Sequence, residues 1–377
     1  MNRSLYPLYA AGFVTAFGAH SIAASLGGLT GSAGSQLLAL GLLLALYDGA
    51  EVLLKPVFGS LADRIGPRPV LLGGLIGFAI ASAAFVVAGN PGWIGLARFG
   101  QGAAAAAFSP AASAMVSRLT ADDAQGRAFG GYGAWKGLGY TLGPLLGGIL
   151  IWAGGYSLLF AVLGGVAALT ALWATMSVPA LDPLPRQRQT IVDLARRLGS
   201  RQFLLPTAAL AGATGALAVG VGFLPVAGSE HGMGPLATGA VVSVLALTAS
   251  LVQPRIGRAR DAGKVSDGAG IAAGLLLAAA GLAAAAVPGP VGILMAALAI
   301  GAGGGMVTPL GFAHLAQTSP KERLGQTMGS AEVGRELGDA GGPLLVGAIA
   351  AAAGLTLGLA GLAAVLIIVA LAALRLR

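Results

Sequence analysis

The sequence predicts an all-α integral membrane protein of twelve transmembrane helices, arranged as two pseudo-symmetric six-helix bundles with both termini on the cytoplasmic side. Three observations support this fold class. Only 10% of the 377 residues are charged and 56% are hydrophobic, whereas about 25% of the residues of a soluble domain are charged. Twelve apolar stretches are long enough to cross a bilayer, and the two halves of the chain share a pattern at a fixed offset.

A transmembrane helix needs about 20 mostly apolar residues. The first six stretches of this kind are 6–28, 36–58, 69–88, 92–117, 127–152 and 156–178. The second six are 203–227, 235–254, 266–287, 291–313, 324–350 and 354–374. The first stretch leads directly into a second, so we expect it to be retained rather than cleaved as a signal peptide.

A polar stretch that contains prolines and five arginines separates the two sets of helices. Such a composition is typical of a linker. We therefore expect an N-terminal bundle at 1–178, a cytoplasmic linker at 179–202 and a C-terminal bundle at 203–377.

The positive charges predict the orientation, because Lys and Arg near helix ends are retained on the cytoplasmic side. With the amino terminus inside, all but four of the 22 Lys and Arg lie in segments that would face the cytoplasm, and the outer turns hold none. The four exceptions lie inside apolar stretches: Lys55, Arg98, Lys136 and Arg335. An even number of spans follows, with both termini in the cytoplasm.

Composition and missing motifs exclude several classes of function. The net charge of +8 does not indicate a nucleic-acid partner, because the basic residues are spread between apolar stretches. The chain has no cysteine, which excludes a disulfide framework or a thiolate metal site. It has no HExxH or GxxxxGK[ST] motif and no supported Ser-His-Asp arrangement. We expect no enzyme activity, no cofactor and no metal.

An internal repeat relates the two halves at an offset of 199 residues. Nine positions of the first half correspond to nine of the second, eight with the same residue and one with Lys replaced by Arg: Pro110, Gly126, Gly130, Lys136, Gly139, Gly143, Pro144, Leu145 and Gly148 match Pro309, Gly325, Gly329, Arg335, Gly338, Gly342, Pro343, Leu344 and Gly347. At an offset of 198, Pro56, Gly59 and Asp63 match Pro254, Gly257 and Asp261. Two parallel repeats with a substrate site at their interface describe one large transporter architecture.

The segment between the second and third stretches, residues 59–69, reads GSLADRIGPRP. It closely resembles the signature loop of the major facilitator superfamily, Gly-x-x-x-Asp-Arg-x-Gly followed by basic residues. An ordinary polar turn is the alternative. The counterpart in the second half, QPRIGRARDAG at 253–263, keeps the Gly and the Asp but loses the Asp-Arg pair.

The residues of this signature have separate physical roles. Gly59 and Gly66 permit tight turns. Asp63 can accept hydrogen bonds from a helix amino terminus. Arg64 and Arg68 favour the inner membrane surface.

Two further segments resemble motifs of the twelve-helix drug:proton antiporters of that superfamily. Residues 98–107, RFGQGAAAAA, resemble an Arg-x-x-Gln-Gly motif. Residues 137–148, GLGYTLGPLLGG, resemble a Gly-Pro antiporter motif, in which Gly143 allows close backbone approach and Pro144 can bend the helix. Generic helix packing is the alternative for both segments.

Charged residues inside spans indicate where a mechanism is to be sought, because each costs several kcal/mol unless it is paired or faces a cavity. Asp48, Glu51 and Lys55 share one face of the second helix. A second cluster lies in the eleventh helix and consists of Glu332, Arg335, Glu336 and Asp339. In the fold that the resemblance implies, these two helices face each other across the boundary between the halves.

We expect Asp48 or Glu51 to pair with Arg335 in one access state, and separation of the pair to let a carboxylate take up a proton. Protonation would then weaken the closed interface. Permanently paired charges that only fix helix packing are the alternative. The resemblance also implies that Arg98 relays a proton or holds the substrate cavity, with packing against carbonyls as the alternative.

Weaker candidates for the substrate cavity are His20, Lys55, Trp135, Lys136 and Tyr140. Lys136 and Arg335 are equivalent in the repeat, so the halves present related cations to an anionic or polar substrate. A histidine at position 20 could exchange a proton or contact the substrate, but a hydrogen-bonded packing role is at least as common for a lone histidine. The histidines at span ends, His231 and His314, receive no role.

The resemblance implies a secondary active transporter that exports a small organic molecule or drug in exchange for protons by alternating access. It implies a monomer in a bacterial cytoplasmic membrane, in contact with the lipid bilayer, a small-molecule substrate and protons, and with no nucleic acid. A proton symporter or uniporter of a small metabolite is one alternative. A membrane sensor or scaffold that transports nothing is another.

Overall fold

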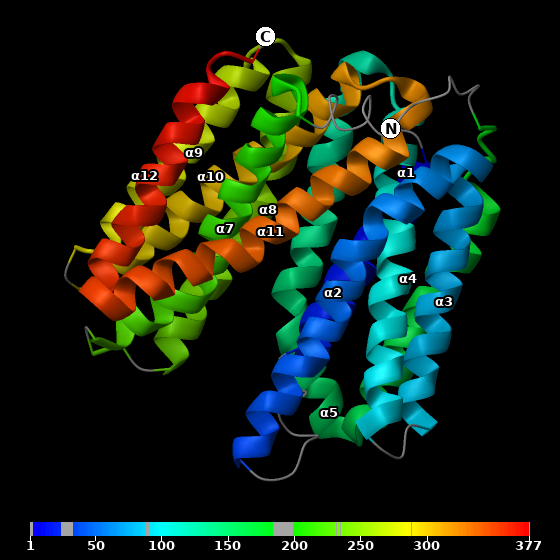
Figure 1. Cartoon of the computed structure of the whole chain (residues 1–377), viewed down its shortest axis with the longest axis horizontal. Helices are drawn as coiled ribbons and strands as arrows, with labels where there is room; N and C mark the ends of the chain where they lie inside the picture. Colours follow the sequence, from blue (N-terminus) through cyan, green and yellow to red (C-terminus); the bar gives the residue numbers. More distant parts are fainter. Residues whose placement is uncertain are drawn as a thin grey trace. The chain divides into compact units, whose positions relative to one another are not determined.

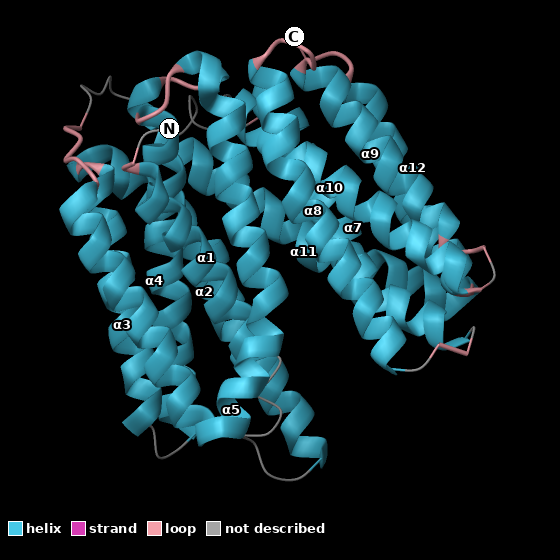
Figure 2. Ribbon diagram, turned by 180° about the vertical axis from the view of Figure 1, so that it is seen from behind, coloured by secondary structure: helices cyan, strands magenta, loops and turns pink. Residues whose placement is uncertain are grey.

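The computed structural model describes residues 3–23, 33–87, 91–183, 199–230, 232–233, 235–287 and 289–376. All regular secondary structure in these residues is helical (Figure 2). Contacts divide the chain into two compact units, each assembled from three segments. Unit 1 comprises Met1–Thr120, Trp135–Pro185 and Ser319–Val333. Unit 2 comprises Ala121–Ala134, Arg186–Thr318 and Gly334–Arg377.

Four helices open the chain within unit 1. They are α1 (Leu5–Ala23), α2 (Ala33–Ile65), α3 (Pro67–Val87) and α4 (Pro91–Arg118). Figure 1 shows α3 beside α4, and α4 also packs against α2 and α1. Unit 1 is therefore built around α4.

The fifth and sixth predicted spans form one long helical element, α5 (Gln125–Ser177), which follows the short 3-10 helix η2 (Asp122–Ala124). Its axis breaks at Gly154 and Gly155. Gly155 has a φ of 69°, a conformation that glycine adopts without a steric penalty. The element begins in unit 2 and belongs to unit 1 from Trp135 onward.

The second half supplies the helices of unit 2. They are α7 (Arg201–Glu230), α8 (Pro235–Asp261), α9 (Asp267–Ala284), α10 (Pro290–Thr318) and α12 (Leu355–Ala373). Within the unit, α10 packs against α7, α8 and α9, and α9 lies beside α12 (Figure 1). The 3-10 helix η3 (Lys321–Arg323) precedes α11 (Leu324–Ala353), which begins in unit 1 and belongs to unit 2 from Gly334 onward.

The helices agree closely with the predicted apolar stretches, and with α5 counted as two the described residues form twelve α-helices. One difference concerns the signature segment, which was predicted as a loop. α2 continues to Ile65, so Gly59 and Asp63 lie in its last turns, and the chain reverses only at Gly66, where φ is 93°. Pro67 then occupies the first position of α3, where its missing N–H costs little.

Among the described residues, seven helices are long and apolar enough to cross a membrane. Large apolar side chains also cover the outside of the helices: Leu53 is 74% exposed, Trp152 88% and Leu344 71%. So much exposed apolar surface is unfavourable in water but suits contact with lipid. The chain is a multi-pass membrane protein, while the count of twelve spans and the orientation of the termini stay predictions.

Glycine pairs let helices approach closely at matching places in the two units. In unit 1, a Cβ on Gly325 of α11 would collide with the carbonyl oxygen of Gly59 of α2, and the reverse also holds. In unit 2, Gly126 of α5 and Gly257 of α8 make the same reciprocal contact. These four positions are related by the internal repeat, so one contact between helices is built twice.

Replacement of Gly325 or Gly126 by alanine should therefore lower the stability of the protein by about 1–3 kcal/mol, because backbone faces the new methyl group. Thermal unfolding in detergent measures the effect. Gly148→Ala is the matched control, since a Cβ at that position of α5 meets nothing within 4 Å. An equal loss of stability at Gly148 would contradict this account of the glycine pairs.

Candidate functional site

The aspartate of the signature segment holds the amino-terminal end of α11 within unit 1. The carboxylate of Asp63 accepts hydrogen bonds from the backbone N–H groups of Gly325 at 2.8 Å and Gln326 at 2.9 Å. These N–H groups have no partner inside the helix, and the positive end of the helix dipole favours the carboxylate. The hydrogen bonding predicted for Asp63 is thus confirmed. We name this contact the unit 1 clamp.

The two arginines of the signature have different surroundings. Arg68 donates a hydrogen bond to the carbonyl oxygen of Thr175 at 2.7 Å, which ties the start of α3 to the end of α5. The Arg64 side chain is exposed.

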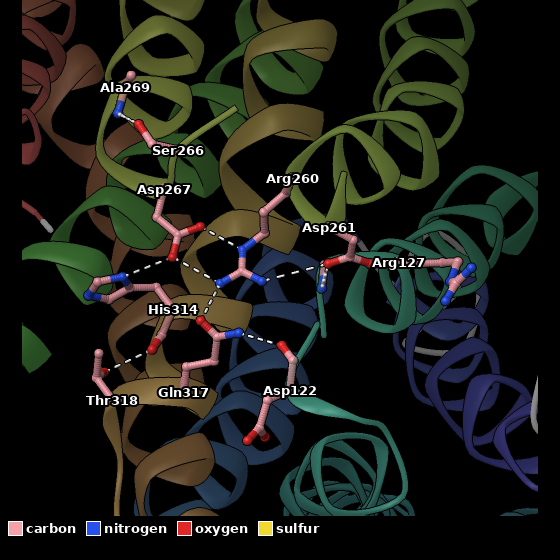
Figure 3. Close-up of polar contacts among 11 residues, drawn as sticks. Asp122, Arg127, Arg260, Asp261, Ser266, Asp267, Ala269, His314, Gln317 and Thr318 are labelled. Atoms are coloured by element: carbon pink, nitrogen blue, oxygen red, sulfur yellow. Dashed lines mark hydrogen bonds and ion pairs between the residues drawn. The ribbon is translucent and has the colours of Figure 1, made fainter. Parts of the chain in front are cut away.

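The second half repeats the clamp in unit 2, although it has lost the Asp-Arg order. The carboxylate of Asp261 accepts from the backbone N–H of Gly126 at 2.8 Å and from that of Arg127 at 2.7 Å (Figure 3). Both residues lie in the first turn of α5. We name this contact the unit 2 clamp, and it shows that the clamp needs the aspartate and not the arginine that follows it.

A group of buried charged and hydroxyl side chains in unit 1, the Glu332 cluster, surrounds the carboxylate of Glu332 on α11. Ser109 of α4 donates to it at 2.6 Å and Ser113, one turn later, at 3.1 Å. Lys55 of α2 lies 3.6 Å away and Lys136 of α5 lies 3.8 Å away. Three helices therefore supply partners to one carboxylate.

Lys55 stands between two carboxylates. Its ammonium nitrogen is 3.0 Å from Glu51, one turn earlier in α2, and 3.6 Å from Glu332. The side chains of Lys55 and Glu332 are 1% exposed and that of Glu51 is 6% exposed. Burial of this kind is tolerated only when the charges are paired.

The serine hydroxyls give the cluster a useful chemical property. A hydroxyl can donate its hydrogen to a carboxylate, and it can also accept one from a carboxylic acid. Ser109 and Ser113 can therefore satisfy Glu332 in both of its protonation states. Lys55 attracts only the ionised form, and it keeps Glu51 as a partner when Glu332 is neutral.

Arg98 lies deep in α4 and is 1% exposed. Its guanidinium carbon is 4.1 Å from the centre of the Tyr47 ring, a cation–π distance. It also donates to Gln101 at 3.4 Å, and Gln101 in turn donates to Ser82 of α3 at 2.9 Å. These contacts cross-link α2, α3 and α4 around the Arg-x-x-Gln segment.

The remaining candidates of α11 belong to unit 2. Arg335 is buried and donates to the neighbouring Glu336 at 3.0 Å, whereas Asp339 is exposed. The predicted pairing of Asp48 or Glu51 with Arg335 stays a prediction. The cation of α2 that the structure pairs with α11 is Lys55, which the sequence analysis grouped with Asp48 and Glu51 and proposed as a cavity residue.

The structure describes the surroundings of some of the other candidate residues but not of all. The ring centres of Trp135 and Tyr9 are 6.5 Å apart, Tyr140 is half-buried and Gly143 is buried. The side chains of Asp48, His20 and Pro144 lie outside the part of the chain that the structure describes.

Sequence reasoning missed the serines of the Glu332 cluster. Ser109 and Ser113 are four residues apart and share a helical face that is otherwise rich in alanine, which was the available signal. It also assigned no role to His314, which makes an ion-pair contact with Asp267.

The fold and these contacts define a class of protein: a helical membrane protein built as a repeat, with paired charges buried among its helices. A family model described as the Major Facilitator Superfamily matches residues 8–266. The chain therefore belongs to the major facilitator superfamily.

Comparisons with individual proteins agree. The chain is 44% identical over 93 residues to the puromycin resistance protein pur8 of Streptomyces alboniger, covering 24% of this chain and 18% of that one. It is 39% identical over 111 residues to the class C tetracycline resistance protein of Escherichia coli, covering 29% and 28%. The matched segments thus span less than a third of either relative.

Solved structures share the fold over nearly the whole chain. The human organic anion transporter MFSD10 (TETRAN) has a TM-score of 0.82 at 18% identity, covering 98% of this chain and 99% of that one. The Escherichia coli fucose:proton symporter FucP has a TM-score of 0.81 at 15% identity, covering 98% and 97%. At such identities the likeness concerns the fold alone.

Lys55 lies between two buried carboxylates, and this gives a prediction about the stability of the protein. Lys55→Met leaves Glu51 and Glu332 buried with one cation fewer, and removal of one partner from a buried ion pair costs about 3–5 kcal/mol. Glu332→Gln should cost less, because Lys55 still has Glu51 and the serines can bond the amide. Thermal unfolding of the two variants in detergent compares them. A larger loss for Glu332→Gln would show that Lys55 is not the centre of the pairing.

Proposed function

We propose that the chain is a secondary active transporter that exports a small organic molecule in exchange for protons by alternating access. Membership of the superfamily and the segments shared with antibiotic resistance proteins support transport and export. The observation that carries the proton coupling is the Glu332 cluster, in which a buried carboxylate has partners suited to both of its protonation states. The proposal includes no cofactor.

In the ionised state, Glu332 ties α11 to its neighbours in unit 1. Its charge faces Lys55 and Lys136, and the hydroxyls of Ser109 and Ser113 donate to it. A proton on Glu332 removes the attraction to both lysines while the hydroxyls re-orient. The free energy of a buried ion pair is lost, and the hold on α11 weakens.

The position of Glu332 allows a weaker hold on α11 to contribute to alternating access. α11 belongs to unit 1 as far as Val333 and to unit 2 from Gly334 onward. Glu332 is thus one residue from the point at which α11 passes from one unit to the other. A proton taken up there changes how the first part of α11 is held, which supports a role in alternating access.

The other predicted groups have supporting roles in the proposal. Glu51 keeps Lys55 paired when Glu332 is neutral, and Arg98 orders α4 beside it. Arg335, Glu336 and Asp339 continue the polar face of α11.

The same proposal includes the topology predicted from the sequence. Two six-helix bundles at 1–178 and 203–377 would be joined by a cytoplasmic linker at 179–202, with twelve spans and both termini inside. A monomer would suffice, because one chain supplies every residue of the cluster.

Transport assays in proteoliposomes test the coupling. With puromycin, tetracycline and other hits of a ligand-stabilisation screen as cargo, an imposed pH gradient should accelerate substrate movement opposite to the protons. Glu332→Gln should lose at least about tenfold of this gradient-driven flux, while it still binds substrate and exchanges it without a gradient. Asp182→Asn, at an exposed aspartate, is the control for loss of a negative charge.

The direction and size of the gradient response separate the alternatives. A symporter moves substrate along with the protons, and a uniporter shows no response to the gradient. A sensor or scaffold produces no flux at all. Gradient-driven antiport that persists at full rate in Glu332→Gln would refute the assignment of coupling to this carboxylate.

A further inference from the structure

A second group of buried polar residues lies in unit 2, where the ends of α8, α9 and α10 meet (Figure 3). The Nδ1 atom of His314 on α10 is 3.0 Å from the carboxylate of Asp267, the first residue of α9. Asp267 also accepts two hydrogen bonds from Arg260 of α8, at 2.6 and 3.0 Å. One carboxylate is therefore shared by a histidine and an arginine.

Arg260 connects this group to the unit 2 clamp. Its guanidinium donates to Gln317 at 2.8 Å and lies 3.7 Å from Asp261, the aspartate of the clamp. Gln317 in turn donates to the carbonyl oxygen of Asp122 in η2, just before α5. A continuous chain of contacts thus runs from His314 to the amino-terminal end of α5.

The Nε2 atom of His314 has unusual surroundings. Its side chain is 4% exposed, and among the described residues the buried Nε2 atom has no hydrogen-bond partner. Because an ionised carboxylate can only accept, the contact with Asp267 places a hydrogen on Nδ1. Nε2 is then the ring atom at which His314 can accept a proton.

The charges around His314 determine what this proton does. Of the helices packed against α10, α9 brings Asp267 and α8 brings Arg260 and Asp261. The charged residues of α7 are only Arg201 and Glu230, at its two ends, and α10 has no other charged residue. Asp122 and Asp123 of η2 are exposed.

The group therefore holds two carboxylates and one arginine when His314 is neutral, and gains a second cation when His314 is protonated. Arg260 alone must balance Asp261 and Asp267 in the first state. In the second, the imidazolium shares the charge of Asp267 and leaves Arg260 freer to support Asp261. Protonation should thus strengthen the clamp.

We propose that His314 is a protonation site that controls how tightly the unit 2 clamp holds the amino-terminal end of α5. The hold is stronger when His314 is protonated than when it is neutral. This inference concerns a conformational response and does not rest on transport activity.

The internal repeat supplies a built-in comparison. His314 corresponds, at the offset of 199, to Met115, which is fully buried in α4 of unit 1. The unit 1 clamp therefore has the same aspartate and the same backbone contacts, but an apolar side chain in the place of the histidine. Of the two clamps, we expect only the one in unit 2 to respond to protonation of a neighbouring histidine.

Hydrogen exchange of the purified full-length protein tests the proposal. Mass spectrometry follows peptides that contain Gly126 and Arg127 and, as the internal reference, peptides that contain Gly325 and Gln326. After correction for intrinsic exchange rates, the protection of the first relative to the second should rise at least about threefold from pH 8 to pH 5.5.

Two variants make the result decisive. His314→Met copies the residue of unit 1, and His314→Gln keeps a donor for Asp267 but takes up no proton. Both should remove the pH response and leave the unit 1 clamp as protected as before, which also shows that the variants are folded. A wild-type ratio that does not change with pH, or a full response in both variants, would overturn the proposal.

Discussion

A carboxylate buried among apolar helices is stable only if its neighbours satisfy it, and this constraint organises the functional part of unit 1. Glu332 draws donors from α2, α4 and α5 to one point of α11. In the proposal, protonation of Glu332 removes its attraction to the lysines and lets the serine hydroxyls accept a hydrogen bond instead of donating one. Packing of α11 therefore depends on the protonation state of Glu332, which is why we propose that proton coupling occurs there.

The internal repeat explains how the ends of α11 and α5 are held in place. Each unit captures the start of a long helix with an aspartate and a glycine pair: α11 through Asp63 and α5 through Asp261. Both captured helices continue into the other unit. The two clamps share their backbone contacts but differ in surroundings, so identical geometry can respond differently to pH.

Much of the fold could be predicted from the sequence, because the length of an apolar stretch and the spacing of glycines can be read directly from consecutive residues. The helices, the hydrogen bonding of Asp63 and the grouping of Glu51 with Lys55 on one face of α2 were all accessible in this way. The helical form of Gly59–Ile65 was not, since the turn depends on Gly66 and Pro67 together.

The choice of partners could not be predicted, because it depends on which side chains the tertiary fold brings together. The family resemblance implied that α2 and α11 face each other, and we expected Asp48 or Glu51 to pair with Arg335; the ion-pair contact that the structure shows between these helices joins Lys55 to Glu332. Ser109 is more than 200 residues from Glu332, and Asp267 is 47 residues from His314. Spacing along one helix carries no information about such contacts.

The most direct test of the central claim is infrared difference spectroscopy of the purified protein between alkaline and acidic pH, which detects the protonation of individual carboxyl groups. The account predicts a band of a protonated carboxylic acid in a poorly hydrated environment that disappears in Glu332→Gln and persists in Asp182→Asn. An unchanged band in Glu332→Gln would mean that the proton is carried elsewhere.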